Sequence, residues 1–251
     1  MFPILQLGPL AIQVPGLILL LGIWVGLTLT ERYAPRRGIA VNTLYNLVFL
    51  GLAAGIIGAR LSYIIRYPSI FIDNPASIIS LNPGLLDSWG GSAMAFIAVI
   101  IYGQKKNLAI WPTLDTLTPF LAVMAVALGL SHTASGSAFG SETNLPWAIE
   151  LWGTQRHPTQ IYETLVALIV LFIVWPKREI WFTFNPGIYF SFFIAISAAF
   201  RLFLEAFRAD SVLILGVFRS AQFIAWIALA LSLWAIARLQ AREKPSSAAS
   251  S

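Results

Sequence analysis

The sequence predicts an all-α, polytopic membrane protein with about seven transmembrane helices and an outward, loop-rich head. Of its 251 residues, 58% are hydrophobic and only 11% are charged, whereas a soluble globular domain carries roughly 25% charged residues. The mean hydropathy is +0.78. Apolar runs close to the ~20 residues that cross a bilayer recur along the chain, and basic residues mark every second connection between these runs.

The first three predicted spans occupy the N-terminal part of the chain. Residues 15–30 form the first apolar run, and residues 44–65 form the second, which contains one arginine, Arg60. Residues 90–102 form the third, which is short unless its helix extends upstream. Each run approaches the length of a helix that crosses the hydrocarbon core.

The remaining four spans are predicted over residues 114–130, 158–175, 187–207 and 216–237. The fifth begins at Pro158, because proline is well suited to the first position of a helix. The polar segment RHPTQIYE starts just before this span and forms its first residues. It is followed directly by the apolar run LVALIVLFIVW. A polar helical face at membrane depth is costly, so it indicates a functional site.

We expect residues 1–237 to form a single transmembrane domain. Its outer head is predicted in the loops 67–89 and 131–157, and the tail 238–251 is polar, rich in small residues and expected to be disordered. The N-terminal stretch MFPILQLGPL has no basic region and no small-residue cleavage site after its apolar run. It is therefore interpreted as a retained segment rather than a cleaved signal peptide.

The basic residues predict the orientation of the chain. Ten of the sixteen lysines and arginines lie in alternate connections, at Arg32, Arg36, Arg37, Lys105, Lys106, Lys177, Arg178, Arg238, Arg242 and Lys244. Because cytoplasmic loops are enriched in Lys and Arg, this set is placed inside, with the N-terminus outside and the C-terminus cytoplasmic. The isoelectric point of about 9.7 is explained by these loops and not by nucleic-acid binding.

Five ionisable residues within the predicted spans gather toward the outer side. They are Arg60, Glu163, Arg201, Glu205 and Arg219. Guanidinium groups bind phosphate oxygens in a planar, bidentate manner, so the arginines suit a lipid headgroup. The alternative is structural, because Arg201 and Glu205 are spaced i,i+4 and can neutralise each other.

Other residue types narrow the chemistry. The chain has no cysteine, which excludes disulfides, a thiolate nucleophile and cysteine-ligated metals. It has only two histidines, His132 and His157, which argues against a histidine-rich metal site. Either histidine is a candidate base. Tyr63 is a candidate for substrate binding, although interfacial anchoring is the simpler interpretation.

Several segments resemble the prolipoprotein diacylglyceryl transferase family, in the same order as in that family and over roughly residues 10–230. RHPTQIYE is similar to the family's RHPSQLYE, and FRLFLEAFRAD to its FRFxxEFxRxPD. GARLSYIIRYP, LLDSWGGSAMA, SGSAFGSETNLPWAI and RSAQFIAW resemble further family segments. The first two matches are the most specific.

The resemblance implies a membrane enzyme of the bacterial inner membrane that begins lipoprotein maturation. It implies phosphatidylglycerol as donor and the lipobox cysteine thiol of a preprolipoprotein signal peptide as acceptor, with release of glycerol phosphate. It implies neither a metal nor an organic cofactor. By position, the implied catalytic residues are Arg201, Glu205, His157 and His132. The implied substrate-binding residues are Arg60, Glu163, Gln160, Arg156, Tyr63, Gly140, Gly90 and Gly91.

The sequence departs from the family pattern in the head loop. The family's essential arginine falls on Leu130 or Gly129, its asparagine on His132 and its glutamate on Ser137, and its HGG histidine falls on Trp89. Two functions therefore stay open. One is the diacylglyceryl transfer itself, and the other is a non-catalytic, lipid-binding subunit of a membrane protein complex.

Overall fold

The computed structural model describes residues 4–7, 10–79, 85–175, 185–214, 216 and 218–241. Most of the predicted tail and the basic pair at 177–178 lie outside these residues. The described residues are mainly helical, which confirms the predicted all-α class. They divide into two compact units, of which the first comprises Met1–Tyr33 and Leu114–Ser251 and the second comprises Ala34–Thr113.

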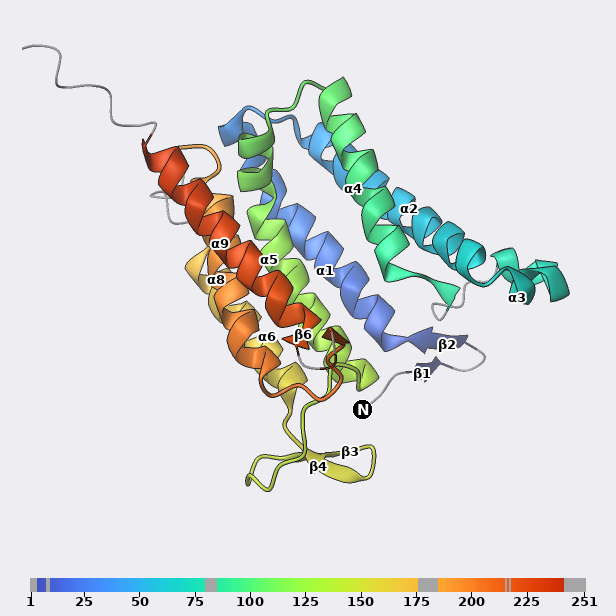
Figure 1. Cartoon of the computed structure of the whole chain (residues 1–251). Helices are drawn as coiled ribbons and strands as arrows, with labels where there is room; N and C mark the ends of the chain where they lie inside the picture. The colour runs from blue at the N-terminus through green and yellow to red at the C-terminus, as the bar shows by residue number, and fades with distance from the viewer. Residues whose placement is uncertain are drawn as a thin grey trace, which may run out of the picture. The chain divides into compact units, whose positions relative to one another are not determined.

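The described residues of the first unit form five helices and three short hairpins, and most of these elements are labelled in Figure 1. Its helices are α1 (Val14–Glu31), α5 (Ile110–Ser135, which begins in the second unit), α6 (Thr159–Ile173), α8 (Ile188–Glu205) and α9 (Ser220–Ala241). Its antiparallel hairpins pair β1 (Ile4–Leu7) with β2 (Leu10–Gln13), β3 (Ile149–Leu151) with β4 (Thr154–Arg156), and β5 (Leu213–Ile214) with β6 (Phe218–Arg219).

The second unit is built on a pair of helices. It contains η1 (Ala34–Arg37), α2 (Val41–Arg66), α3 (Pro68–Asp73), η2 (Pro75–Ile79) and α4 (Ser88–Lys105). Glycines let α2 and α4 approach closely, since a Cβ on Gly58 would lie 2.3 Å from the Cβ of Met94. Close backbone approach through small residues is the usual way in which membrane helices pack.

Five helices in the described part of the chain are long and apolar enough to cross a membrane, namely α1, α2, α5, α8 and α9. Helix α6 is apolar but shorter, and α4 coincides with the short third predicted span. Each of the seven predicted segments thus overlaps a helix. The polytopic membrane fold is confirmed, and the count of seven spans stays a prediction.

Three element boundaries differ from the expected ones. Helix α5 continues through residues 131–135, which were expected in a loop, and within this last part Thr133 Oγ1 donates to the carbonyl of Gly129 over 2.9 Å. Helix α4 starts upstream of the third predicted span, where the Asp87 side chain accepts from the N–H groups of Trp89 and Gly90. Helix α9 begins after Arg219, so that arginine lies on β6 and not inside a helix.

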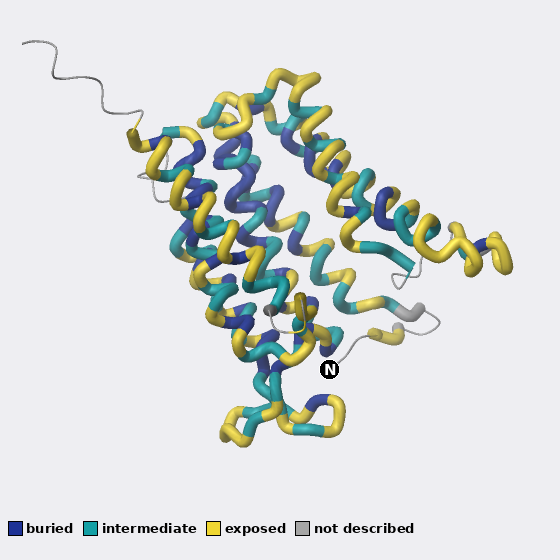
Figure 2. Tube along the Cα trace, in the orientation of Figure 1, coloured by how far each residue is buried: buried dark blue, intermediate teal, exposed yellow. Residues whose placement is uncertain are grey.

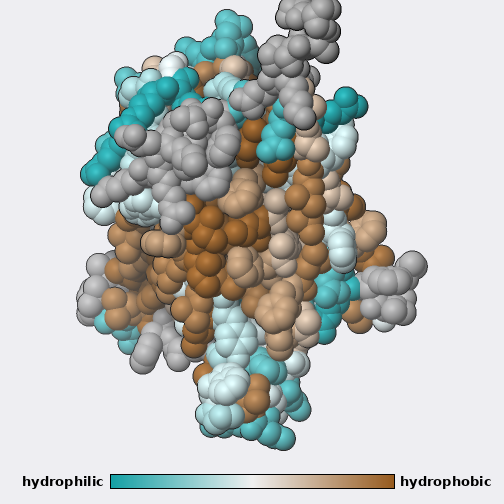
Figure 3. All heavy atoms as spheres, turned by 90° about the vertical axis from the view of Figure 1, so that its left-hand side faces the viewer, coloured by the Kyte–Doolittle hydropathy of each residue, from teal (hydrophilic) through white to brown (hydrophobic). Residues whose placement is uncertain are grey.

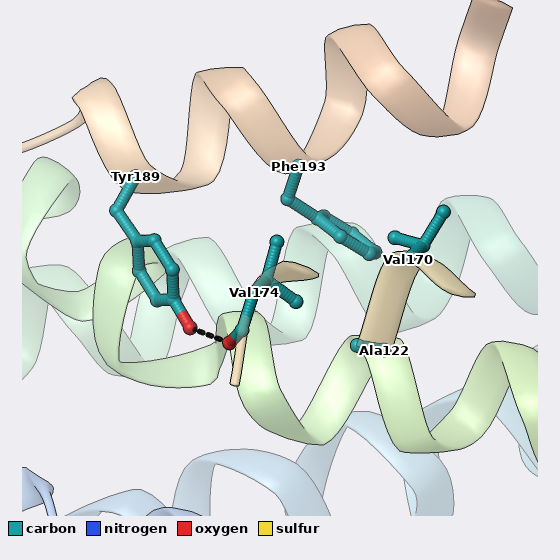
Figure 4. Packing of buried hydrophobic residues seen from close by; sticks show 5 residues of the cluster. All are labelled: Ala122, Val170, Val174, Tyr189 and Phe193. Carbon is teal, nitrogen blue, oxygen red and sulfur yellow. Dashed lines mark hydrogen bonds between the residues drawn. The ribbon is translucent and has the colours of Figure 1, made fainter. Parts of the chain in front are cut away.

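Helices α5, α6 and α8 share the core of the first unit. Ala122, Val170, Val174, Tyr189 and Phe193 form its buried cluster (Figure 4). The Tyr189 hydroxyl donates to the carbonyl of Val174 at the end of α6. This bond satisfies a polar group that would otherwise be buried without a partner.

One buried charge of the first unit is structural. Asp115 of α5 is 2% exposed, and its carboxylate accepts from the N–H of Gly187 over 2.8 Å and of Phe190 over 2.9 Å. These donors belong to the N-terminus of α8, where backbone N–H groups lack intrahelical partners and favour an anion. Asp115 therefore caps α8 from a neighbouring helix.

The surface of the first unit matches a helical bundle in lipid. Exposed residues run along the whole of α9 (Figure 2), and they include Phe223, Trp226 and Trp234. Figure 3 shows hydrophobic surface over the helices on this face and more hydrophilic surface at the end that carries β3 and β4. The polar end identifies the part of this unit that projects from the spanning helices.

Candidate functional site

A carboxylate on α6 lies at the centre of the candidate site. Glu163 Oε1 accepts from Arg201 Nη1 of α8 over 2.7 Å and from Arg208 Nη1, just beyond α8, also over 2.7 Å. The other oxygen, Oε2, lies 3.0 Å from Nδ1 of His132 on α5. The side chain of Glu163 is 12% exposed. Three separate segments thus converge on one largely buried anion.

A second carboxylate, Glu205, holds the same arginines from the other side. Its Oε2 lies 3.0 Å from Arg201 Nη2 and 4.0 Å from Arg208 Nε. Its Oε1 accepts from the hydroxyl of Ser211 over 2.5 Å, and its backbone carbonyl accepts from Arg219. Glu205 is 1% exposed, so a charge this deep requires such partners.

Arg208 is fixed in place more firmly than Arg201. It donates to both oxygens of Asp210, from Nε over 2.9 Å and from Nη2 over 3.0 Å. Burial favours the neutral form of its guanidinium, but the hydrogen bond to Asp210 and the charge of Glu163 prevail and raise its pKa above the ordinary value. Arg208 is 12% exposed and Arg201 is 36% exposed. Arg201 is therefore the guanidinium more accessible to a ligand.

A cavity of about 170 Å³ adjoins this cluster. His132, Glu163 and Arg201 line it together with an apolar wall from α5, α6 and α8, formed by Ala125, Leu128, Val166, Ala167, Val170, Phe200 and Leu204. Gly129 and Ser197 complete the lining. An apolar cavity with a few polar groups is the usual form of a site for an amphipathic ligand.

Close packing of α5 on α6 brings His132 to Glu163. A Cβ on Gly129 would lie 2.5 Å from Thr164 Oγ1 and 3.0 Å from the Thr164 backbone nitrogen and Cα, so the two helices touch at this point. His132 follows Gly129 by three residues and Glu163 precedes Thr164 by one. Residues three apart on a helix share a face, so the contact aligns the two side chains.

The head is a small, ordered structure rooted on the loop after α8. Ser141 N donates to the carbonyl of Phe207 over 2.8 Å, and Ala209 N donates to that of Phe139 over 3.0 Å. These bonds flank Arg208 and set its position. Gly140, between them, lies against His157, because a Cβ there would be 2.3 Å from the His157 carbonyl oxygen. The predicted binding residue Gly140 thus has a packing role.

Arg156 supports the head from within. It donates from Nε to the carbonyl of Leu151 over 3.2 Å and from Nη1 to that of Gly140 over 3.3 Å, and its guanidinium lies over the ring of Phe139. It also pairs with Glu142 at 3.5 Å. These contacts give Arg156 a role in holding the β3–β4 hairpin.

His157 and Gln160 lie near the cluster without lining the cavity. The ring of His157 packs against Phe207 and Tyr162, with centroids 5.3 and 6.3 Å apart, and in the described part of the chain its buried Nδ1 has no hydrogen-bond partner. Gln160 is 1% exposed, and among the described residues neither atom of its amide is bonded. Thr159 Oγ1 anchors this turn by donating to the carbonyl of Ala138 over 2.6 Å.

The other predicted site residues belong to the second unit. Tyr63 packs on the rings of Tyr67 and Phe71, with centroids 4.8 and 6.2 Å away. A Cβ on Gly90 would lie 2.1 Å from the Cβ of Ser62, and one on Gly91 would lie 2.9 Å from the Cβ of Ala59. Both glycines therefore serve the packing of α4 on α2. That these residues and Arg60 share a site with Glu163 stays a prediction.

Arg208 is the functional candidate that sequence reasoning missed. It lies just beyond the end of α8, where the structure joins it to Glu163. The signal was present, because Arg201, Glu205 and Arg208 are spaced by four and three residues within FRLFLEAFRAD. That spacing continues one helical face past the apolar run.

Most of the chain is similar in sequence to known proteins. The family model "Prolipoprotein diacylglyceryl transferase" matches residues 3–238. The phosphatidylglycerol–prolipoprotein diacylglyceryl transferase of Finegoldia magna is 31% identical over 212 residues, which are 83% of this chain and 84% of that protein. Proteins of the same name from Lysinibacillus sphaericus and a Nostoc species are 29% and 27% identical, each over 96% of this chain and over 92% and 90% of their own lengths.

Proposed function

We propose that this chain, which belongs to the prolipoprotein diacylglyceryl transferase family, transfers a diacylglyceryl group from phosphatidylglycerol to the cysteine thiol of a prolipoprotein. The names of its relatives supply the donor and the acceptor. The observation that carries the proposal is the pair of guanidinium groups, Arg201 and Arg208, beside an apolar cavity. A phospholipid presents this combination of an anionic phosphate and apolar chains.

Arg201 and Arg208 are assigned to the lipid phosphate. Arg201 donates through Nη1 to Glu163 and is ion-paired through Nη2 with Glu205, so it can exchange one of these partners for a phosphate oxygen while the other keeps it in place. Arg208 is held by Asp210 and adds a fixed positive charge. Fixed donors of this kind stabilise charge that develops in a transition state, typically by about 10²–10³ in rate per donor.

The proposed reaction is a substitution at carbon. The thiolate sulfur forms a bond to the carbon of the diacylglyceryl group that carries the phosphate. The bond between this carbon and the phosphate oxygen breaks. The bonding electrons leave with the oxygen, so glycerol phosphate departs with an additional negative charge beside the arginines. The thiol proton passes to a base on the protein. Glu163 and Glu205 orient the arginines through the contacts described above.

The remaining predicted residues complete the proposal. Gln160 is suited to the lipid headgroup, because its buried amide has a donor and an acceptor to offer. That Arg60 takes part in lipid binding stays a prediction from the sequence. The roles of Arg156 and Gly140 are indirect, through the head.

We further propose that the chain lies in the bacterial inner membrane with the β3–β4 head outside and the C-terminus in the cytoplasm. The bias of lysines and arginines supports this orientation. The β3–β4 hairpin lies at the hydrophilic end and directly precedes α6, and Glu163 lies near the start of that helix. A cysteine accessibility scan of this cysteine-free chain tests the orientation, since a cysteine at Trp152 should react from the outside only.

A non-catalytic, lipid-binding subunit is the second candidate. The observation that favours it is the loss of the family's head-loop arginine. Leu130 is 44% exposed and carries no donor, and Gly129 is packed too tightly on Thr164 to carry a long side chain. Stable copurification with other membrane proteins, together with bound lipid and no turnover, is the result that distinguishes this function.

Turnover by the purified protein tests the proposed enzymatic function. The full chain in lipid nanodiscs with phosphatidylglycerol and a lipobox peptide should release glycerol phosphate. Arg201→Ala should reduce this rate by about 10²-fold or more. Arg238→Ala is the matched control, because Arg238 lies in the last turn of α9 over Trp234 and outside the cluster. A wild-type rate no higher than that of Arg201→Ala contradicts catalysis.

A further inference from the structure

We infer that His132, held by Glu163, is the base that takes the proton from the acceptor thiol. This role rests on the proposed function and adds to it the identity of the base. The family resemblance puts an asparagine at this position and a histidine where this chain has Trp89. In this protein the structure supplies an imidazole from α5 instead.

The contact with Glu163 sets the tautomer of His132. The Glu163 carboxylate already accepts from two guanidinium groups at Oε1, so it is ionised and can only accept at Oε2 as well. Nδ1 of His132, 3.0 Å from Oε2, therefore carries the proton. In the neutral imidazole Nε2 then has the lone pair, which is the form that a general base requires.

The free nitrogen is available to a substrate. His132 lines the cavity together with Arg201, and its side chain is 25% exposed. Among the residues that the structure describes, Nε2 has no hydrogen-bond partner. A thiol that enters beside a lipid phosphate bound at Arg201 thus meets an unoccupied acceptor on the same cavity wall.

The charged groups around His132 favour transfer of a proton from the thiol to the imidazole. Glu163 of α6 contacts the imidazole directly. The ion-pair network extends from that carboxylate to Arg201 and Glu205 of α8 and to Arg208 and Asp210 of the following loop. As the thiol gives up its proton, Glu163 stabilises the imidazolium and the departing phosphate balances the arginines.

The competing bases are occupied or poorly placed. His157 packs on aromatic rings and does not line the cavity. Glu205 is 1% exposed and engaged by Ser211 and Arg201. Glu163 is engaged at both carboxylate oxygens, by Arg201 and Arg208 at Oε1 and by His132 at Oε2.

The test compares His132→Gln with His157→Gln over a range of pH. In the wild type the rate with a lipobox peptide should fall toward acid pH as the imidazole becomes protonated. His132→Gln should lower kcat by about 10²–10⁴-fold and abolish that acid limb, while binding of phosphatidylglycerol changes less than about threefold. His157→Gln should retain the acid limb. Added imidazole should restore part of the rate of His132→Ala, which leaves space in the cavity wall.

The outcomes separate this role from the proposed function. A wild type without turnover overturns both. A wild type that turns over, with a His132→Gln variant that keeps its rate and its acid limb, overturns the role of His132 alone. A loss of rate caused by weaker lipid binding, without imidazole rescue, also overturns it, because a base acts on the chemical step.

Discussion

Arg208 donates from Nη1 to Glu163 Oε1 over 2.7 Å, and this bond connects the loop after α8 to the N-terminal part of α6. This pair joins the two segments that resemble the family most specifically. Because Arg201 uses the same oxygen, loss of Arg208 leaves Glu163 with one guanidinium instead of two. The site is therefore a network in which the positions of both arginines depend on one carboxylate.

Replacing Arg208 tests that dependence. Arg208→Lys keeps the charge but loses the paired hydrogen bonds to Asp210. We expect kcat/KM to fall by about tenfold or more in Arg208→Lys and further in Arg208→Ala. Steady-state rates measure this, with Arg238→Ala as the control. Equal activity of the lysine variant and the wild type would show that only the charge of Arg208 matters.

Glu163→Gln should disturb the site more than the fold. The amide can still accept from an arginine, but it removes the negative charge that holds Arg201, Arg208 and His132. We expect a decrease in turnover of at least about 10²-fold, with near-native thermal unfolding. Turnover and unfolding are measured on the same preparation. A variant that retains full activity would refute the central position of this carboxylate.

Gly129 sets the distance between α5 and α6. Gly129→Ala inserts a methyl group against Thr164, and overpacking of this kind costs about 1–3 kcal/mol. The expected result is a lower melting temperature together with loss of turnover, because His132 is moved from Glu163. Gly16→Ala is the control in the same unit, since a Cβ there meets nothing within 4 Å.

Gly91 should be sensitive for reasons of packing within the second unit. A Cβ at this position would lie 2.9 Å from both the Ala59 Cβ and the Gly55 carbonyl oxygen. We expect Gly91→Ala to destabilise the protein by about 1–3 kcal/mol. Gly103→Ala, later in α4 and with nothing within 4 Å, should be neutral or slightly stabilising. Denaturation in detergent compares the two, and a Gly91→Ala variant as stable as Gly103→Ala would contradict this packing role.

Asp87 should make α4 sensitive to acid. Desolvation works to raise its pKa, but hydrogen bonds from the Gly90 and Trp89 N–H groups and the charge of Arg66 prevail and lower it. Because the pKa of Asp87 is lowered in the folded protein, its ionised carboxylate stabilises the fold at any pH above the ordinary carboxyl pKa. This contribution is lost as the pH falls through the pKa of Asp87 in the folded protein. Asp87→Asn should flatten this acid dependence of unfolding. An unchanged dependence would assign the acid sensitivity to other carboxylates.

Much of the helical framework was predictable because apolar runs are long and basic loops separate them. The same pattern predicted that Glu163, Arg201 and Glu205 gather at one depth, and the structure joins these three. The partner of a side chain is less predictable, since it depends on tertiary packing. Contact of Gly129 with Thr164 decides that His132, rather than His157, meets Glu163.

The head was expected as an irregular loop for a related reason. Strands β3 and β4 have three residues each, too few to show an alternating pattern. Their turn uses Trp152 and Gly153, both with positive φ, whereas Asn-Gly is the usual signal for such a turn. The hairpin is supported instead by Arg156, whose bonds to carbonyl groups arise only in the folded chain.

Mass spectrometry of the acceptor peptide tests the central claim most directly. The wild type, incubated with phosphatidylglycerol and a lipobox peptide, should add one diacylglyceryl group to the cysteine and release one glycerol phosphate for each modified peptide. A peptide with serine in place of that cysteine should stay unmodified, and Arg201→Ala should give little product. Lipid that binds tightly to the wild type while the cysteine peptide keeps its original mass would contradict a working transferase at the Glu163 cluster.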